Sequence, residues 1–180
     1  KDGAFYGPKI DIDMKDALGR EWQLATIQLD FQLPERFKLE YVDKDGKKKS
    51  PVIIHAAIFG AFERFIGIML EHFGGNLPLR ISPVQIEIIP VSEKFNDYAE
   101  KINSLLLAEN IRSEINDKNE SLGKRISESE KQKIPYILVV GEKEETSESV
   151  TARIRGTKEQ TVLKTTEFIE KVLKEIKEKK

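Results

Sequence analysis

Apolar and polar residues alternate in the first part of the chain, which is the pattern expected of β-strands that bury one face. The alternation predicts strands over residues 9–14, 22–31, 37–42 and 52–54. In the first of them Ile10, Ile12 and Met14 share one face, which we expect to be half-buried. The Asp45-Gly46 pair between the last two strands predicts a tight hairpin turn.

A single helix is predicted after these strands, over about residues 60–73. Its apolar positions recur at spacings of three and four, and Gly74-Gly75 ends it. Strands followed by one strongly amphipathic helix indicate an antiparallel sheet with a helix, which is the α+β class.

Strands and helices take turns in the remainder of the chain. Strands are predicted over residues 85–91, 112–115, 135–140 and 150–155, the last as an edge strand. Helices are predicted from a cap at Ser92, over residues 121–132, and from Thr165 onward. The alternation indicates a small α/β domain with a mixed, partly parallel sheet. The change of pattern near Pro83 predicts two domains, residues 1–83 and 84–180.

The composition narrows the kinds of function that the chain can have. It has 30 Lys and Arg against 31 Asp and Glu, balanced in both predicted domains, so a broad basic surface for nonspecific nucleic-acid binding is not expected. The longest apolar run falls short of the roughly 18 residues of a membrane span. Without cysteine, the chain has neither disulfides nor thiolate metal sites. We expect a cytoplasmic protein without membrane contact, and Lys1 in place of Met suggests a piece of a longer polypeptide.

The sequence holds no self-contained catalytic motif, so single side chains are the candidates. His55 follows an apolar strand, and an isolated histidine there more often belongs to a polar network than to a metal site. It could bind zinc only with ligands from elsewhere, since a catalytic zinc needs about three protein ligands. Arg64 lies among apolar residues of the predicted helix, where a partly buried guanidinium needs an anionic partner. That partner is either a phosphate or an intrachain carboxylate, for which Asp11, Asp13 and Asp30 are available.

Several runs of residues match those of one protein family. They are Gly3-Ala-Phe-Tyr-Gly-Pro-Lys-Ile-Asp11, residues 16–23, 26–31 and 33–36, Gly60-Ala-Phe-Glu-Arg-Phe-Ile-Gly67 and, further on, residues 83–85, 119–120, 135–136 and 140–144. Over essentially all 180 residues the chain resembles the bacterial threonyl-tRNA synthetases. The resemblance implies that residues 1–83 are the C-terminal part of a class II catalytic domain, built on an antiparallel sheet. Residues 84–180 would be the anticodon-binding domain.

The resemblance also implies roles for side chains of the catalytic domain. Arg64 matches the arginine of motif 3 that clamps the ATP phosphates. His55 matches the last of three zinc ligands, in a site where zinc holds the amino group and hydroxyl of threonine. The substrate-binding positions are matched by Tyr6 for threonine, by Lys9 near the phosphates, and by Gln23, Thr26 and Gln28 in the adenylate pocket. The chain departs from the usual family residues at Leu24-Ala25, Ala56, Ala61 and Arg80.

In the second domain the resemblance implies contacts with RNA bases. Asn119, Glu144 and Arg153 match residues that read the anticodon, and amide, carboxylate and guanidinium groups suit the edges of unstacked bases. The expected partners are therefore threonine, ATP with Mg²⁺, and tRNA(Thr). The full-length enzyme is expected to be a homodimer.

The rest of the active site is expected outside this chain. Motifs 1 and 2 and the other two zinc ligands, one of them cysteine, would precede Lys1. We therefore predict that the chain is part of a threonine–tRNA ligase and does not charge tRNA alone. The alternative is a truncated paralogue, a module that binds tRNA or another RNA without catalysis.

Overall fold

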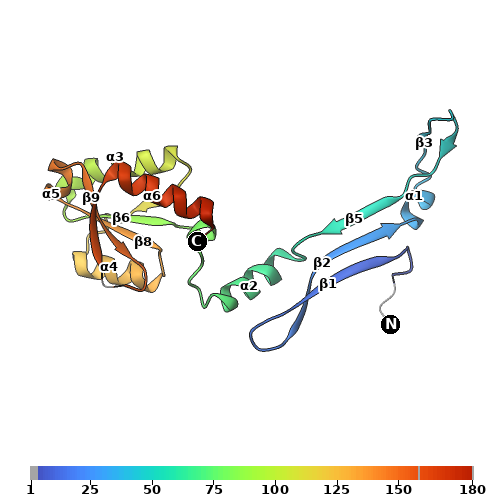
Figure 1. Cartoon of the computed structure of the whole chain (residues 1–180), viewed down its shortest axis with the longest axis horizontal. Helices are drawn as coiled ribbons and strands as arrows, with labels where there is room; N and C mark the ends of the chain where they lie inside the picture. The colour runs from blue at the N-terminus through green and yellow to red at the C-terminus, as the bar shows by residue number, and fades with distance from the viewer. Residues whose placement is uncertain (1–3, 158, 180) are drawn as a thin grey trace. The chain divides into compact units, whose positions relative to one another are not determined.

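The chain folds as two compact units, Lys1–Gly74 and Gly75–Lys180, in a computed structural model (Figure 1). The structure describes residues 4–157 and 159–179, so Lys1 and Gly3 of the sequence-based interpretation lie outside the described residues. The segment before Pro83 packs with the second unit, since Arg155 Nη2 donates to the carbonyl oxygen of Leu77 at 2.8 Å. The division between the two units therefore falls before the change of sequence pattern near Pro83.

The first unit is built on a three-stranded antiparallel sheet in the order β1-β2-β5. Its elements are β1 (Lys9–Lys15), β2 (Glu21–Asp30), α1 (Gln32–Arg36), β3 (Tyr41–Val42), β4 (Lys48–Lys49), β5 (Ile53–Ala57) and α2 (Phe62–His72). Strands β3 and β4 form a separate hairpin, in which Gly46 has a φ of 75°. The predicted antiparallel sheet, hairpin and amphipathic helix are confirmed.

The turn between β1 and β2 is closed by Asp16. Its Oδ1 accepts hydrogen bonds from the backbone N–H groups of Leu18 and Arg20, both at 2.9 Å. Its Oδ2 accepts from Trp22 Nε1 at 2.9 Å and from Arg20 Nε at 2.5 Å. Because the Trp22 bond and these donors favour the charged carboxylate, they lower the pKa of Asp16 well below its usual range.

Two predictions for the first unit are wrong. The strand expected over residues 37–42 is reduced to Tyr41–Val42, because residues 37–39 form the hydrogen-bonded turn that ends α1. The apolar face expected to be half-buried is exposed: Ile10, Ile12 and Met14 keep 64%, 51% and 56% of their accessible surface. No layer of the described part of this unit packs on them, so alternation identified the strand without showing what covers it.

The second unit has a five-stranded sheet in the order β10-β9-β8-β6-β7. Strand β6 pairs in parallel with β7 and β8, while β9 and β10 are antiparallel, which confirms the predicted mixed sheet. The elements are η1 (Leu79–Ile81), β6 (Ile86–Pro90), η2 (Glu93–Phe95), α3 (Asn96–Ala108), β7 (Ser113–Ile115), α4 (Leu122–Lys131), β8 (Tyr136–Val140), α5 (Glu142–Thr146), β9 (Ser149–Ile154), β10 (Gln160–Lys164) and α6 (Thr165–Glu178). The edge position predicted for residues 150–155 is wrong, because β10 covers that side of β9.

The core of the second unit lies between the sheet and helices α3 and α6, which cover the same face (Figure 1). Ile102 of α3 and Phe168 of α6 are buried against Ile88 and Leu138 of the central strands. Helix α4 lies on the opposite face, against β6. Glu87 and Ile89 alternate along β6 with the core residues Ile86 and Ile88, so they point to the face that α4 covers.

The two predicted serine caps have different outcomes. Ser121 caps α4, with its side-chain oxygen accepting from Lys124 N at 3.3 Å. Ser92 precedes the short helix η2 instead of α3 and makes no side-chain cap. Helix α3 begins at Asn96, so the prediction of a direct Ser92 cap is wrong.

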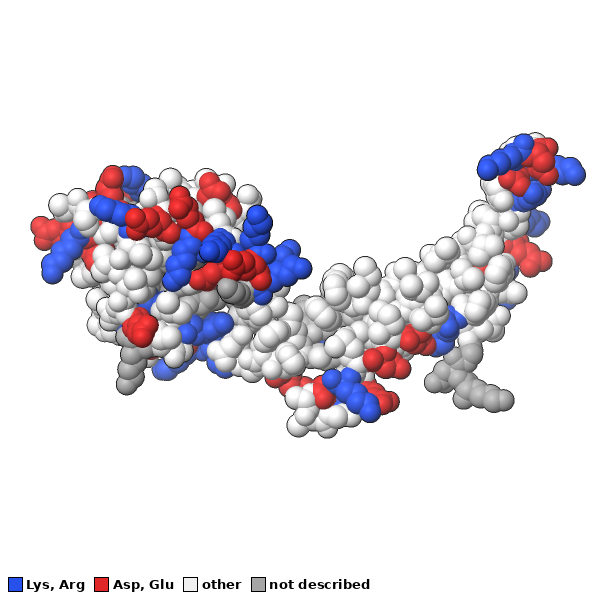
Figure 2. Space-filling model, viewed as in Figure 1, with Lys and Arg blue, Asp and Glu red and all other residues white. Residues whose placement is uncertain are grey.

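Charged side chains of both signs are mixed over the surface of the second unit. On the face shown in Figure 2, Lys and Arg lie next to Asp and Glu, without a continuous basic area. Among the described residues, no helix is both long enough and apolar enough to cross a bilayer.

Candidate functional site

The polar face of the β1-β2-β5 sheet carries most of the site residues predicted in the first unit. Lys9 of β1 lies opposite Gln28 of β2, which lies opposite His55 of β5. Residues that are directly opposite in adjacent strands share a face, so these three side chains form one row across the sheet. Asp11 and Thr26 form the next row.

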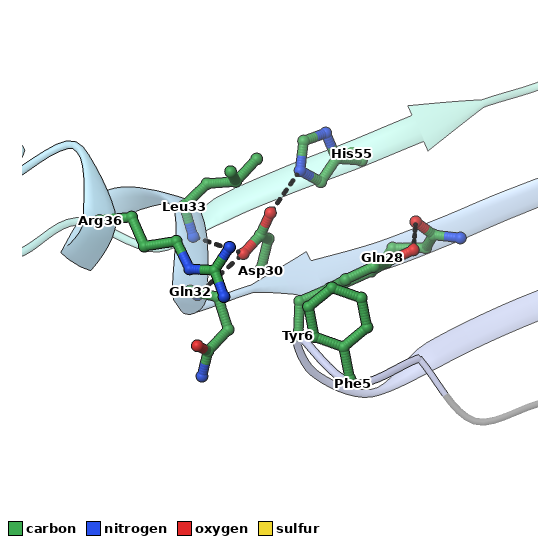
Figure 3. A pocket seen from close by; sticks show the side chains of 8 residues that line it. All are labelled: Phe5, Tyr6, Gln28, Asp30, Gln32, Leu33, Arg36 and His55. Atoms are coloured by element: carbon green, nitrogen blue, oxygen red, sulfur yellow. Dashed lines mark hydrogen bonds and ion pairs between the residues drawn. The ribbon is translucent and has the colours of Figure 1, made fainter.

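One end of this face forms a cavity of about 390 Å³. Its lining consists of Phe5, Tyr6, Gln28, Asp30, Gln32, Leu33, Arg36 and His55 (Figure 3). Tyr6 Oη donates to Gln28 Oε1 at 2.9 Å, which joins two of the predicted residues. The turn that presents Tyr6 requires glycine at position 7, because a Cβ there would lie 2.4 Å from the carbonyl oxygen of Leu29.

His55 is held by a buried carboxylate. Its Nε2 lies 3.0 Å from Asp30 Oδ2, and its side chain keeps 44% exposure while that of Asp30 keeps 3%. The other Asp30 oxygen accepts from the backbone N–H groups of Gln32 and Leu33, which starts α1. The backbone bond from Leu33, aided by His55, lowers the pKa of Asp30 and keeps it ionised.

This environment fits a metal-binding histidine, because ligand imidazoles usually bond a carboxylate through their second nitrogen. It fits a polar-network histidine equally, as the sequence left open. Within the residues that the structure describes, no group of three His, Cys, Asp or Glu side chains could hold a metal. Any zinc ligand set would therefore need groups beyond His55 from outside the described part of the chain.

Asp11 connects three of the predicted site residues. Its carboxylate accepts from Gln23 Nε2 and Thr26 Oγ1, both at 2.7 Å, and lies 2.6 Å from Lys9 Nζ. The bond from Lys9 is the main reason that the pKa of Asp11 is lowered. The Asp11 carboxylate therefore bonds all three groups and orients their side chains.

Arg64 stands at the start of α2, beside the same face. Its Nη1 donates to the carbonyl oxygen of Gln23 at 3.2 Å. The side chain is exposed, and among the described residues it forms no ion pair with Asp11, Asp13 or Asp30. The partial burial that the sequence analysis expects for this guanidinium is therefore wrong, and none of the three aspartates pairs with it.

The sequence analysis predicts no site role for Arg36, and it gives Asp11 and Asp30 only as possible partners of Arg64. The carboxylates carried a signal, since Asp11 follows Lys9 and Asp30 follows Gln28 at the two-residue spacing of one strand face. Arg36 had no such signal, because it lies on α1, a helix that was not predicted.

In the second unit, two of the three predicted base-reading residues lie at one edge of the sheet. Asn119 follows β7 and Glu144 follows β8, at the carboxyl ends of parallel strands, where ligands of α/β sheets commonly bind. Asn119 lines a cavity of about 200 Å³ together with Val91, which follows β6. Glu144 accepts from Thr151 Oγ1 at 2.7 Å and from Gly141 N at 3.1 Å.

Arg153 lies in a different cavity, of about 540 Å³. Its Nη2 is 3.5 Å from Glu130 Oε1 of α4, and it lies two residues beyond Thr151 on the same face of β9. Thr151 thus links Glu144, to which it donates a hydrogen bond, with Arg153, which shares its face of β9. Asn119 lies in a separate cavity beyond the carboxyl end of β7.

Two protein families match the chain along its length. Residues 85–175 match the "Anticodon binding domain" family, and residues 1–73 match the "tRNA synthetase class II core domain (G, H, P, S and T)". The threonine–tRNA ligase catalytic subunit of Saccharolobus islandicus is 52% identical over 176 residues, which are 98% of this chain. The chain belongs to the threonyl-tRNA synthetase family.

Members of this family in both archaea and bacteria are similar to the chain. The threonine–tRNA ligase of Carboxydothermus hydrogenoformans is 50% identical over 179 residues, 99% of this chain. The resemblance is therefore not particular to bacterial members. The matched residues are 32% of the Saccharolobus protein and 28% of the Carboxydothermus protein, so the chain spans about a third of these relatives.

Solved structures show the same fold. The RNA binding domain of threonyl-tRNA synthetase from Cryptosporidium parvum aligns with a TM-score of 0.82 and 44% identity, over 96% of this chain and 44% of that one. Prolyl-tRNA synthetase from the same organism aligns with a TM-score of 0.70 at 24% identity, over 98% of this chain and 38% of that one. The second likeness concerns the fold alone.

Proposed function

We propose that the chain is part of an enzyme that activates threonine with ATP and transfers it to tRNA(Thr). The observation that carries the proposal is the single polar sheet face on which Lys9, Gln28 and His55 form one row and Asp11 gathers Lys9, Gln23 and Thr26. Residues 1–83 would contribute part of the catalytic domain, and residues 84–180 would bind the anticodon. The assembled enzyme would be a cytoplasmic homodimer.

The groups of this face suit the two halves of a threonyl-adenylate. Tyr6 and Gln28 line the cavity that would hold threonine, and Gln23 and Thr26 offer amide and hydroxyl groups to the adenylate. Arg64 has no carboxylate partner among the described residues and supplies a planar cation for the ATP phosphates, aided by Lys9. A cation placed there stabilises the charge that develops on phosphate oxygens as the adenylate forms.

Metal ions would complete the site in the assembled enzyme. His55, oriented by Asp30, would be one zinc ligand, and zinc would supply a Lewis acid for the amino group and hydroxyl of threonine. Valine lacks that hydroxyl and would be rejected. Mg²⁺ would accompany the ATP phosphates. The contribution of this chain is the orientation of the imidazole ring, which the carboxylate of Asp30 fixes.

In the second unit, Asn119, Glu144 and Arg153 would read anticodon bases. Their amide, carboxylate and guanidinium groups offer complementary donors and acceptors to base edges. The mixed charges of this unit leave recognition to a few placed groups instead of a basic surface. The test is binding of an anticodon hairpin of tRNA(Thr) by the chain with all three residues changed to Ala. Tight binding that survives the triple change would remove these residues from the reading role.

The chain alone is expected to be inactive in aminoacylation, because His55 would have to share zinc with ligands from other segments. The purified chain is incubated with threonine, ATP, Mg²⁺, Zn²⁺ and tRNA(Thr), and charged tRNA is measured. No charging above background is expected. Charging above background would show that the chain holds a complete site.

A second candidate function is RNA binding without catalysis. It is favoured by the likeness of 96% of this chain to a structure described as an RNA binding domain. The gene separates the two candidates. If the reading frame continues upstream into motif 2 and two further zinc ligands, the chain is part of the enzyme. If a start codon lies close to Lys1, the chain is an RNA-binding module.

A further inference from the structure

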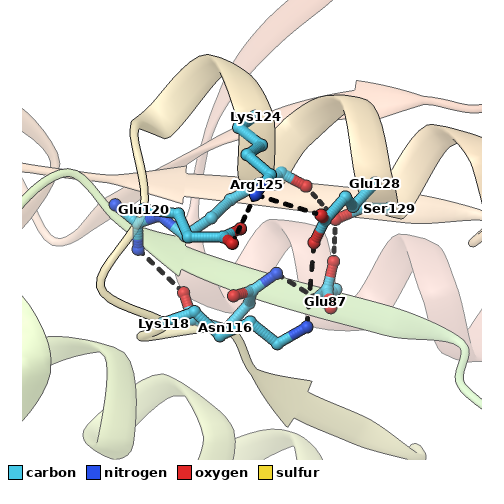
Figure 4. Close-up of polar contacts among 8 residues, drawn as sticks. All are labelled: Glu87, Asn116, Lys118, Glu120, Lys124, Arg125, Glu128 and Ser129. Atoms are coloured by element: carbon cyan, nitrogen blue, oxygen red, sulfur yellow. Dashed lines mark hydrogen bonds and ion pairs between the residues drawn. The ribbon is translucent and has the colours of Figure 1, made fainter.

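The segment that carries Asn119 rests on a buried polar network (Figure 4). We call residues 116–121, between β7 and α4, the β7–α4 loop. Most buried side chains of this unit are apolar, yet Glu87, Asn116, Arg125 and Ser129 are all at most 8% exposed beneath this loop. Burying polar and charged groups costs stability unless they bond to one another.

Glu87 connects strand β6 to both ends of the network. One of its carboxylate oxygens accepts from Asn116 Nδ2 at 3.4 Å, and the other accepts from the hydroxyl of Ser129. Asn116 begins the β7–α4 loop, and Ser129 lies near the end of α4. A single buried carboxylate therefore ties both segments to β6.

Arg125 fixes the same loop from the side of α4. Its Nη1 donates to the carbonyl oxygen of Asn116 at 2.8 Å. The outer part of the loop is held by Lys124, whose Nζ lies 2.6 Å from Glu120 Oε1, and by the Ser121 cap. The main chain is bonded on both sides of Asn119 as well, because Asn116 N donates to Ile88 O of β6 at 2.9 Å and Arg125 N of α4 donates to Ser121 O at 3.1 Å.

Unpaired polar atoms gather at this loop. Among the described residues, the buried side-chain atoms without a hydrogen-bond partner are Asn96 Oδ1, Asn116 Oδ1, Glu120 Oε2 and Arg125 Nε. Three of these residues, Asn96, Glu120 and Arg125, line the same cavity of about 200 Å³ as Asn119. Buried polar groups without a protein partner are rare, and those that line this cavity remain available to water or to a ligand.

We propose that Glu87, Asn116 and Arg125 are positioning residues that hold the β7–α4 loop in the one conformation in which Asn119 meets an RNA base. Asn119 makes the contact, and the three buried residues act through it. The proposal rests on the base-reading role of Asn119 proposed above. It predicts that these side chains, each at most 8% exposed, control discrimination between bases.

The experiment compares variants of the 180-residue chain with two RNA hairpins. One carries the anticodon stem-loop of tRNA(Thr), and the other carries the same stem with the three anticodon bases replaced. Discrimination is the ratio of the two dissociation constants from fluorescence anisotropy at one fixed salt concentration. Glu87→Leu and Arg125→Met are expected to lower this ratio about fivefold or more. Glu87→Gln keeps an acceptor for Asn116 and is expected to retain most of the ratio.

Hydrogen exchange measured by mass spectrometry tests, without RNA, whether Arg125 holds the β7–α4 loop in place. Amides of residues 117–121 are expected to exchange about tenfold faster in Arg125→Met than in the unchanged chain. The matched control is Tyr136→Phe, which removes a partly buried hydrogen bond on the opposite face of the sheet. Tyr136→Phe is expected to change neither the exchange of the loop amides nor the ratio of dissociation constants, even if it destabilises the chain as much as Arg125→Met does.

The outcomes distinguish the positioning role of Glu87, Asn116 and Arg125 from the base-reading role of Asn119. If Asn119→Ala lowers the ratio and the folded Glu87→Leu and Arg125→Met variants do not, the positioning role is overturned while the reading role stands. Unchanged loop exchange in Arg125→Met overturns the positioning role by itself. If Asn119→Ala leaves the ratio unchanged, the reading role falls and the positioning proposal falls with it.

Discussion

Thr26 Oγ1 donates to Asp11 Oδ1 at 2.7 Å, across a register in which the two residues lie directly opposite each other in β2 and β1. The same carboxylate holds Gln23 and Lys9. Three groups expected to meet a nucleotide are thus oriented by one charge before any ligand arrives. Preorganisation of this kind reduces the entropy that a ligand must lose on binding.

The Asp11 network should persist to unusually low pH. Donors that favour the charged form depress the native pKa, so the stabilisation is present above the unfolded value of about 3.9 and is lost as pH falls through the lower native value. The side-chain amide signal of Gln23, followed by NMR, should therefore shift only below the usual aspartate range. In Asp11→Asn it should not titrate. A midpoint near 3.9 or above would contradict the network.

Glu87 should give the opposite pH dependence of stability. Burial raises its pKa, despite the bonds from Ser129 and Asn116 and the nearby charge of Lys118, and Glu114 adds to the increase. Arg125 and Glu128 of α4 are the other charged groups beside it in the network (Figure 4). A raised native pKa means that its contribution is greatest below the unfolded value of about 4.3 and is lost as pH rises through the native value.

Glu87→Gln removes that titration. The free energy of unfolding of the unchanged chain, from urea titrations, should therefore fall relative to Glu87→Gln as pH rises above about 4.3. Below that pH the difference between the two proteins should stay constant. A difference that does not change with pH would show that Glu87 titrates alike in the folded and unfolded states.

The hydroxyl of Tyr136 should contribute measurably to stability. It donates to Glu175 at 2.8 Å, and the tyrosine is 4% exposed and packs edge-to-face on Phe168. Tyr136→Phe keeps the ring contacts and removes a hydrogen bond to a charged group, so we expect a loss of about 1.5–3 kcal/mol in the free energy of unfolding. Urea unfolding measures it, and no loss would show that water replaces the bond without cost.

The Ser121 cap should stabilise α4 modestly. Ser121→Ala removes the acceptor for Lys124 N, and because the 3.3 Å bond is long we expect a loss near the lower end of about 0.5–2 kcal/mol. Ser127 lies inside α4, where Ala is the better helix former by about 0.5 kcal/mol. Ser127→Ala should therefore be neutral or stabilising. Equal losses in the two variants, measured by thermal unfolding, would exclude the cap.

The spacing of apolar residues predicted the helices and strands that have a regular apolar face, and it did not predict the mainly polar ones. Strand β10 has Val162 exposed at 64%, and helix α5 has no buried residue, so neither carries an apolar pattern. Helix α1 starts because Asp30 accepts two backbone N–H bonds, which a pattern of apolar positions does not indicate.

The candidate site could be predicted only as separate residues. The resemblance supplied Lys9, Gln28 and His55, but their alignment in one row depends on strand register. The β-bulge between Ile12 and Asp13 also depends on strand pairing. It leaves Leu24 without a partner and places Gln23 opposite Asp13. The separation of Asn119 from Arg153 into two cavities also follows from the fold of the sheet and not from sequence spacing.

The central claim is that the second unit reads the anticodon bases of tRNA(Thr). Its most direct test is anticodon discrimination by the unchanged 180-residue chain. Its dissociation constant is measured for the tRNA(Thr) anticodon hairpin and for the hairpin with replaced anticodon bases, at the same salt concentration. We predict about tenfold or more weaker binding of the second hairpin. Equal affinity for the two hairpins, or no binding of either, would contradict the account.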